Sequence, residues 1–315
     1  MMSYHKNDAE INVKSNWKHE INKEDEEIKV KEKSLQKNKD NLNFGNAGEL
    51  YLIRCGESEL NASGKFAGWL NPKLSLNGIE ESMKCGRFLK EMNIKFDVCY
   101  TSILKRAITT WNYIADEMDL HYIPIKKYWQ LNARHYGALQ GMLKSDISEN
   151  YGVDQLNIWR MSGKIVLPDI DDDDPNNPKF DPLFKEIPVS CIPLQETLND
   201  TIKRLENVYY ENIYKDILEG KNVVVVSHQN TMRALVTLIE GLSEIELYEL
   251  EFRNCETTKY KMNVNNKLIH VPLTPGKLST INQSKLLEKN KDQLQKSDQK
   301  IIENDSNDLN KNQIE

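Results

Sequence analysis

Three short apolar runs, each followed at once by polar or charged residues, divide the chain between residues 49 and 228. Residues 49–53 are Glu-Leu-Tyr-Leu-Ile, residues 96–100 are Phe-Asp-Val-Cys-Tyr, and residues 223–226 are four consecutive valines. Apolar runs of this length that end in polar turns are typical of buried parallel strands. The pattern predicts a strand at each of these places.

Stretches with apolar residues three or four positions apart follow the predicted strands. We expect one helix over residues 75–92, which opens at Ser75 and carries Ile79 and Met83 at helical spacing. A second helix is expected around residues 105–107, capped by the pair at 101–102, and a third over residues 231–240, ended by Gly241. Strands that alternate with helices predict an α/β fold, a three-layer αβα sandwich with a mainly parallel central sheet.

The two ends of the chain have a different composition from its middle. Residues 1–47 and 273–315 are rich in Lys, Glu, Asn, Gln and Asp and contain few residues able to pack. Such segments bury too little apolar surface to offset the entropy of ordering, so we expect polar, disordered extensions. A lid or a partner-binding tail is the alternative for the C-terminal one. Residues 48–272 would then form one globular domain.

An acidic and proline-rich segment interrupts this domain at residues 156–197. It contains four consecutive aspartates at 171–174 and six prolines. Proline at this density excludes long helices and central strands, so the segment is expected to be an extended surface insertion. The aspartates lack the glycine turn and distal glutamate of a calcium loop, which favours a solvated loop over a metal site.

Composition excludes several classes of protein. The net charge is −6 with both signs spread along the chain, so neither nucleic acid nor an anionic membrane is an expected partner. No apolar run approaches the roughly 20 residues that cross a bilayer. The five cysteines include no CxxC pair, which argues against a zinc site or a disulfide scaffold. We expect a soluble, cytoplasmic protein.

Basic and nucleophilic side chains follow the three predicted strands. Arg54 and Cys55 follow the first, Arg106 lies just after the second, and His228 follows the third. Carboxyl ends of parallel strands meet at one edge of a sheet, where α/β proteins bind ligands. Guanidinium groups, an imidazole and a helix N-terminus together suit phosphate. From these residues alone, pairing of the same side chains with surface carboxylates stays an open alternative.

Residues 52–61 have the sequence Leu-Ile-Arg-Cys-Gly-Glu-Ser-Glu-Leu-Asn. Together with residues 66–69, 100–108, 131–141 and 227–235, they resemble the motifs of the 2,3-bisphosphoglycerate-dependent phosphoglycerate mutases, in the histidine phosphatase superfamily. The resemblance extends over about residues 49–270. It implies an isomerase of the phosphotransferase type, which interconverts 2- and 3-phosphoglycerate in glycolysis. It also implies 2,3-bisphosphoglycerate as phosphoryl donor, with no permanently bound cofactor.

The resemblance further implies roles for individual residues. Arg54, Arg106 and His228 match the residues that surround the transferred phosphoryl group in the family. The full set that matches substrate-binding positions is Arg54, Ser58, Asn61, Gly68, Arg106, Arg134, Tyr136, Lys144, Arg160, His228 and Asn230.

Two positions depart from the chemistry of the family. Cys55 stands where the family has its phosphorylated histidine, and Ala133 stands where it has its general acid/base glutamate. Gln229 replaces a glycine and Met161 an arginine. Loss of a nucleophile costs about six powers of ten in rate, and loss of a general acid/base roughly two to four. We therefore expect a protein without activity, or with little, that still binds phosphate or a small phosphorylated acid.

Two other functions stay open. Cys55, flanked by arginines, could act as a nucleophile, with Glu57 or Glu59 as a recruited acid, in an active mutase or a phosphomonoesterase. Against this, the C-x5-R loop of phosphocysteine chemistry is missing, because the sixth residue after Cys55 is Asn61. The third possibility is a regulatory or structural partner of an active relative, in a homodimer or a hetero-oligomer.

Overall fold

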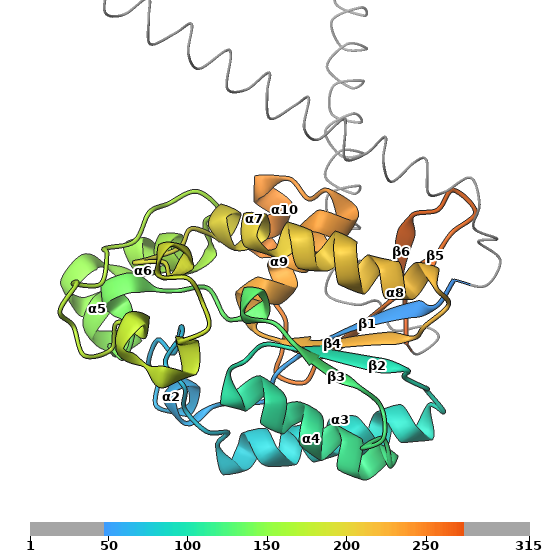
Figure 1. Ribbon diagram of the computed structural model, residues 1–315. Helices are drawn as coiled ribbons and strands as arrows, with labels where there is room; N and C mark the ends of the chain where they lie inside the picture. Colours follow the sequence, from blue (N-terminus) through green and yellow to red (C-terminus); the bar gives the residue numbers. More distant parts are fainter. Residues whose placement is uncertain (1–46, 274–315) are drawn as a thin grey trace, which may run out of the picture. The chain divides into compact units, whose positions relative to one another are not determined.

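The structure is a computed structural model that describes residues 47–273. In this part of the chain one sheet has the strand order β3-β2-β4-β1-β5-β6 (Figure 1). Its parallel strands are β1 (Glu49–Arg54), β2 (Val98–Thr101), β3 (Ile125–Lys127) and β4 (Val223–Ser227). The antiparallel strands β5 (Thr257–Met262) and β6 (Leu268–Val271) extend the sheet beyond β1. The three predicted strands and the mainly parallel sheet are confirmed.

Helices cover both faces of this sheet (Figure 1). The helices α3 (Leu76–Glu91) and α4 (Lys105–Met118) lie on one face, and α7 (Leu198–Val208), α8 (Lys215–Leu218) and α9 (Gln229–Glu240) lie on the other. Alternation along β1 divides the core between the two faces, because successive side chains of a strand point to opposite sides. Leu50 and Leu52 pack in the cluster that includes α7 and α9, whereas Tyr51 and Ile53 pack in the cluster that includes α3 and α4. This is the predicted three-layer αβα sandwich.

Shorter elements complete the described part of the chain. The remaining α-helices are α2 (Glu59–Ala62), α5 (Lys144–Tyr151), α6 (Val153–Met161) and α10 (Glu244–Glu249), and a π-helix spans Tyr209–Tyr214. Because α6 continues through Met161, the acidic insertion starts later than the predicted residue 156. From there to α7 the chain forms short 3-10 turns at Pro178–Phe180, Pro182–Phe184 and Val189–Cys191, which agrees with its proline content.

The helix ends test the predicted caps. α3 is confirmed, and the Ser75 hydroxyl accepts a hydrogen bond from the Gly78 backbone N–H at 3.0 Å. The predicted cap of α4 at residues 101–102 is wrong, because α4 begins at Lys105 after Leu104. α9 begins at Gln229, two residues earlier than predicted, and ends at Gly241, whose φ of 67° is in the left-handed region that favours glycine.

The predicted polar extensions lie outside the described residues, apart from Ala47 and Leu273 at their inner ends. Within residues 47–273, no helix is both long and apolar enough to cross a membrane.

A buried ion pair fixes the segment that leads into the sheet edge after β3. Arg204, on α7, contacts the Glu196 carboxylate at 2.5 Å. The same guanidinium group donates to the backbone carbonyls of Asn132 at 2.9 Å and Ala133 at 3.0 Å. Glu196 also accepts from the His135 backbone N–H at 2.7 Å. One ion pair therefore holds the main chain of residues 132–135 in place.

Truncation of Arg204 is expected to destabilise the fold strongly. Arg204→Ala leaves the Glu196 carboxylate buried without its cation and removes one of the donors to each of the carbonyls of Asn132 and Ala133, which costs about 3–5 kcal/mol. Urea unfolding followed by circular dichroism measures the change. The control is Lys203→Ala at the adjacent exposed position of α7, where we expect a change within about 0.5 kcal/mol. Equal effects of the two substitutions would contradict the anchoring role.

Candidate functional site

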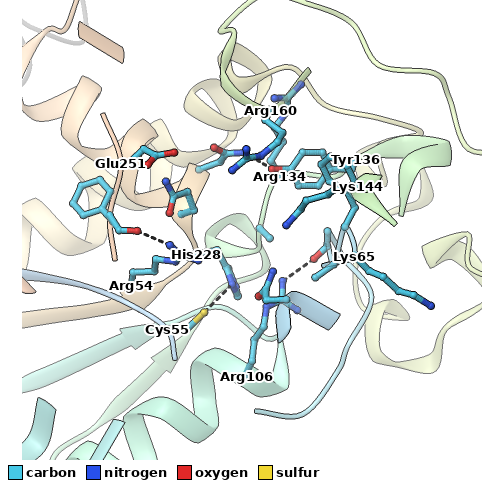
Figure 2. A pocket seen from close by; sticks show the side chains of 18 residues that line it. Arg54, Cys55, Lys65, Arg106, Arg134, Tyr136, Lys144, Arg160, His228 and Glu251 are labelled. Atoms are coloured by element: carbon cyan, nitrogen blue, oxygen red, sulfur yellow. Dashed lines mark hydrogen bonds between the residues drawn. The ribbon is translucent and has the colours of Figure 1, made fainter. Parts of the chain in front are cut away.

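A pocket of about 250 Å³ opens at the carboxyl edge of the parallel strands (Figure 2). The strand register explains why side chains converge there. Arg54 is paired with Ser227 and Thr101 with Val226, so the next residues, Cys55, His228 and Ser102, all follow aligned strand ends. The predicted residues that line the pocket are Arg54, Cys55, Asn61, Gly68, Arg106, Ala133, Arg134, Tyr136, Lys144, Arg160, His228 and Asn230.

Ser58 is the predicted site residue that does not line this pocket. It is fully buried, and its hydroxyl donates to the Asn61 side-chain oxygen at 2.8 Å. Ser58 is also the N-cap of α2 and accepts from the Asn61 backbone N–H. Its place is therefore behind Asn61, where it can orient that side chain.

The pocket is strongly cationic. Six arginine and lysine side chains line it, against one carboxylate, Glu251, among the described lining residues. The six cations are Arg54, Lys65, Arg106, Arg134, Lys144 and Arg160. The sequence did not single out Lys65, although it directly precedes the recognised motif at residues 66–69. Nor did it single out Glu251 and Phe252, which belong to the irregular segment between α10 and β5 and carry no motif.

Backbone carbonyls, rather than carboxylates, orient the arginines at the pocket floor. Arg106 is only 2% exposed and donates to the carbonyls of Leu70 at 2.8 Å and Gly68 at 2.7 Å. Arg54 donates to the carbonyl of Phe252. A carbonyl fixes the direction of a guanidinium group without cancelling its charge. The positive charge is therefore available to a bound anion.

Arg134 is held in the same way on another wall of the pocket. Its guanidinium donates to the carbonyls of Glu196 at 2.6 Å and Trp159 at 3.0 Å. It also lies over the Tyr136 ring, 5.5 Å from the centroid. With these donors engaged, Arg134 contributes mainly its charge to the pocket.

Cys55 lies at the base of the pocket, directly after β1. The side chain is 5% exposed, and Sγ is 3.6 Å from Nδ1 of His228. Burial raises the pKa of the thiol, and the nearby charges of Arg106 and Arg54 only partly oppose that effect. Cys55 is therefore a thiol rather than a thiolate.

His228 is the N-cap of α9 and faces both Cys55 and Ser102. Its Nε2 is 2.8 Å from the Ser102 hydroxyl oxygen, which also accepts from the Leu104 backbone N–H at 3.2 Å. Burial lowers the pKa of the imidazole well below its ordinary value, and Arg106, Arg204 and Arg54 lower it further. His228 is therefore neutral. Ser102 lies two residues before Leu104, the N-cap of α4, and is therefore not the helix cap.

Ala133 places no acid in the pocket. Its backbone carbonyl accepts from Nε1 of Trp69 at 2.7 Å, in addition to Arg204. The two acids considered from the sequence do not line the pocket. Glu57 accepts from the Ser75 hydroxyl at 2.7 Å, and Glu59 is exposed in the first turn of α2. A recruited acid at Glu57 or Glu59 is thus not supported by the geometry.

Two polar side chains of the pocket lining, Asn230 and Tyr136, are hydrogen-bonded to each other. The Asn230 amide donates to the Tyr136 hydroxyl oxygen at 2.8 Å, while its carbonyl oxygen accepts from Arg233 at 2.9 Å. The Tyr136 O–H is left to donate to a ligand. Burial lowers the pKa of Lys144, and Arg160 and Arg54 lower it further, as expected for like charges that face one cavity.

His135, inside the motif at residues 131–141, is not part of the pocket lining. It is fully buried, and its Nδ1 accepts from the Gly137 backbone N–H at 3.1 Å. Burial, with a contribution from Arg204, lowers its pKa to about 3. Its role in the described structure is to fix the turn that carries Tyr136.

Acid is expected to destabilise the fold through the buried neutral histidines His135 and His228. The pKa values of His135 and His228 are lower in the folded protein than the ordinary 6.5, so the unfolded chain binds more protons as the pH falls. Stability present above pH 6.5 is lost toward pH 3, by about 1.4 kcal/mol per pH unit for each histidine. Urea unfolding between pH 7 and 4 measures the slope. His135→Gln should reduce it, whereas His121→Gln at an exposed position should not; equal slopes would contradict the assignment.

The fold and the pocket define an α/β protein with a cationic pocket at the carboxyl edge of its parallel strands. Residues 50–271 match the histidine phosphatase superfamily (branch 1). The chain is 42% identical over 223 residues to 2,3-bisphosphoglycerate-dependent phosphoglycerate mutase 1 of Lactobacillus johnsonii, which covers 70% of this chain and 97% of the relative. It is 41% identical to the corresponding mutase of Treponema denticola, over 70% of this chain and 89% of the relative. The chain therefore belongs to the phosphoglycerate-mutase-like part of the histidine phosphatase superfamily.

Solved structures show the same fold at lower sequence identity. YhfR of Bacillus stearothermophilus matches with a TM-score of 0.55 and 19% identity, over 75% of this chain and all of that one. A mycobacterial glucosyl-3-phosphoglycerate phosphatase matches with a TM-score of 0.55 and 17% identity, over 71% of this chain and 97% of that one. At these identities the likeness concerns the fold.

Proposed function

We propose that this protein binds phosphate or a small phosphorylated acid in the cationic pocket, and that its phosphoglycerate mutase activity is lost or severely impaired. The observation that carries the proposal is the contrast within one pocket. The cations expected to hold the ligand converge there, whereas the two positions expected to perform the chemistry hold Cys55 and Ala133. The reaction expected to be lost or severely impaired is the family reaction, with 2,3-bisphosphoglycerate as phosphoryl donor.

Binding of an anion is supported by the positive charge of the pocket and by its neutral hydrogen-bonding groups. Six cations against one carboxylate give the pocket a large positive potential, and buried positive charge is costly unless an anion compensates it. The Tyr136 O–H and the Asn61 side chain add neutral hydrogen-bonding groups. A ligand with a phosphate at the floor and a carboxylate toward Lys144 would meet cations at both ends.

Impaired catalysis is supported by the protonation states. Phosphoryl transfer to a side chain requires an unprotonated nucleophile and a group that donates a proton to the leaving oxygen. Cys55 is held as a thiol, and Ala133 has no proton to donate. Neutral His228 lies 3.6 Å from the sulfur, where it can stabilise a bound anion without supplying both missing functions.

A thermal-shift titration tests the binding claim. Phosphate, 3-phosphoglycerate and 2,3-bisphosphoglycerate should each raise the melting temperature, because a ligand at 100 times its Kd stabilises the fold by about 2.7 kcal/mol. Glycerate, which lacks phosphate, is the matched control at equal ionic strength. No shift with any of the phosphorylated ligands at millimolar concentration would refute the binding claim.

The contact between Cys55 and His228 favours a second candidate, a weak phosphomonoesterase with Cys55 as nucleophile. His228 would accept the thiol proton and pass it to the leaving ester oxygen as sulfur attacks phosphorus and the P–O bond breaks; water would then cleave the S–P bond, which releases phosphate and restores the thiol. Steady release of phosphate from 3-phosphoglycerate that disappears in Cys55→Ser would support this activity. Release that persists in the variant would exclude Cys55.

A further inference from the structure

Cys255 has a backbone conformation that suits glycine. Its φ of 54° lies in the left-handed region. The Cys255 N–H donates to the Arg54 carbonyl at 2.9 Å, and the Arg54 N–H donates to the Glu256 carbonyl at 3.2 Å. This is the hydrogen-bond pattern of a G1 β-bulge, in which two residues face one and the first of the two is a glycine. The bulge fixes Cys255 beside the end of β1, at a cost in backbone strain.

The strand order places Cys55 between His228 and Cys255. β1 lies between β4 and β5, and Cys55 directly follows β1, His228 directly follows β4, and Cys255 comes two residues before β5. On one side, Sγ of Cys55 is 3.6 Å from Nδ1 of His228. On the other side, Cys55 adjoins the main-chain contact between Arg54 and Cys255. Facing residues of antiparallel strands have Cα atoms about 4.5–5.5 Å apart, and a disulfide bridges roughly 4.4–6.8 Å.

The side chains of Cys55 and Cys255 lie on the same face of the sheet. Cys255 packs against the core cluster that contains Ile53, and its Sγ is 3.8 Å from the hydroxyl oxygen of Ser82 on α3. Cys55 is two residues beyond Ile53 and therefore on the same side as Ile53. Burial raises the pKa of the Cys255 thiol, and Cys85 and Cys55 raise it further, as expected for thiols that are close together.

We propose that Cys55 and Cys255 form a reversible disulfide, so that Cys55 is a modification site for hydrogen peroxide. This inference goes beyond the proposed function and does not depend on phosphate binding. Cys55 lines the pocket, where a molecule as small as a peroxide reaches it, whereas Cys255 lies outside the lining and acts as the second thiol. Rotation of the Cys55 side chain toward Cys255 takes the sulfur away from His228, so the disulfide removes the thiol from the pocket floor.

The oxidation proceeds in two steps that balance with one peroxide. First, the Cys55 sulfur attacks a peroxide oxygen and the O–O bond breaks; His228 takes the thiol proton and passes it to the departing hydroxide, which leaves as water. Cys55 is then a sulfenic acid. Second, the Cys255 sulfur attacks the Cys55 sulfur, the S–O bond breaks, and hydroxide leaves as water with the Cys255 proton. Burial raises the pKa of both thiols, so the reaction is slow.

Peptide mapping by mass spectrometry tests the assignment. The full chain is incubated with hydrogen peroxide, alkylated and digested without reductant. Wild-type protein should yield a linked Cys55–Cys255 peptide, which dithiothreitol removes. Cys255→Ser should yield none, and its Cys55 should take up at least about three times more of the sulfenic-acid reagent dimedone, because the thiol that consumes the sulfenic acid is missing. Cys255→Gly, which suits the backbone of the bulge, gives the same test if the serine variant does not fold.

The control variant is Cys191→Ser at an exposed cysteine, which should keep the linked peptide. A linkage of Cys255 to Cys85 instead of Cys55 would overturn the proposal. So would a wild-type chain in which Cys55 and Cys255 stay unlinked under conditions that oxidise Cys191, or equal dimedone labelling of Cys55 in wild type and Cys255→Ser. Phosphate binding is measured separately on the reduced protein, and its failure would refute the proposed function without affecting the disulfide.

Discussion

The double substitution Cys55→His and Ala133→Glu is expected to raise mutase turnover by at least about three powers of ten over the wild-type protein. Nucleophile and general acid/base act together, so restoring both should recover far more activity than either alone. The pocket already places residue 55 beside His228 and Arg106, and residue 133 in the same lining. Residue 55 directly follows β1, and residue 133 lies in the segment held by Arg204, so neither substitution falls within a strand.

A coupled assay of 2-phosphoglycerate formation, with 2,3-bisphosphoglycerate present, measures this recovery. The single substitutions are the matched controls, and Cys55→Ser with Ala133→Glu controls for contaminating host mutase. The two new side chains also have to fit, because residues 55 and 133 are 5% and 7% exposed, so circular dichroism must show a folded protein. A folded double variant that binds 3-phosphoglycerate but has no activity would show that further catalytic groups have been lost.

The substitution Arg106→Met is expected to weaken phosphate binding by about a hundredfold or more. Arg106 is buried at the floor of the pocket, and its charge reaches both Cys55 and His228, as the effects on their pKa values show. Charge-assisted hydrogen bonds to a buried anion contribute about 1.5–3 kcal/mol each, and a guanidinium group can make two. Isothermal titration with inorganic phosphate measures the loss.

Arg87→Met is the matched control for this experiment. Arg87 is exposed on α3 and pairs with Glu117 at 2.7 Å, away from the pocket lining. Its removal should change the phosphate affinity by less than about twofold. Similar losses in the two variants would indicate a general effect of net charge rather than a site at Arg106.

The layers of the fold could be predicted from local patterns. Four valines at 223–226 and the alternating core of β1 are strong signals, because the physics of a strand is contained in a few adjacent residues. Helix starts were less predictable. Ser102 has the chemistry of a cap, yet it contacts His228, which is 126 residues away in the sequence. A competing long-range partner of this kind leaves no trace in a local pattern.

In the site, too, some residues could be predicted from local sequence and others depend on long-range packing. Arg54, Arg106 and His228 could be predicted to converge because each follows a strand end, and the register of a parallel sheet aligns those ends. Glu251 comes from an irregular segment whose path depends on how α10 packs, so nothing in its neighbourhood indicated the pocket. The positions of Cys55 and Ala133 relative to the family chemistry came from motif resemblance, since an isolated thiol or methyl group has no pattern of its own.

Main-chain carbonyls orient Arg54, Arg106 and Arg134, and this affects which functions of the pocket a mutation can remove. A cation held by a carboxylate depends on a second side chain, and either partner can be lost by one mutation. Here the acceptors are parts of the backbone at Gly68, Leu70, Phe252, Trp159 and Glu196, which substitution does not remove. Under the proposed function, the charges of the pocket can therefore outlast the catalytic residues, so that loss of turnover and loss of recognition become separate evolutionary events.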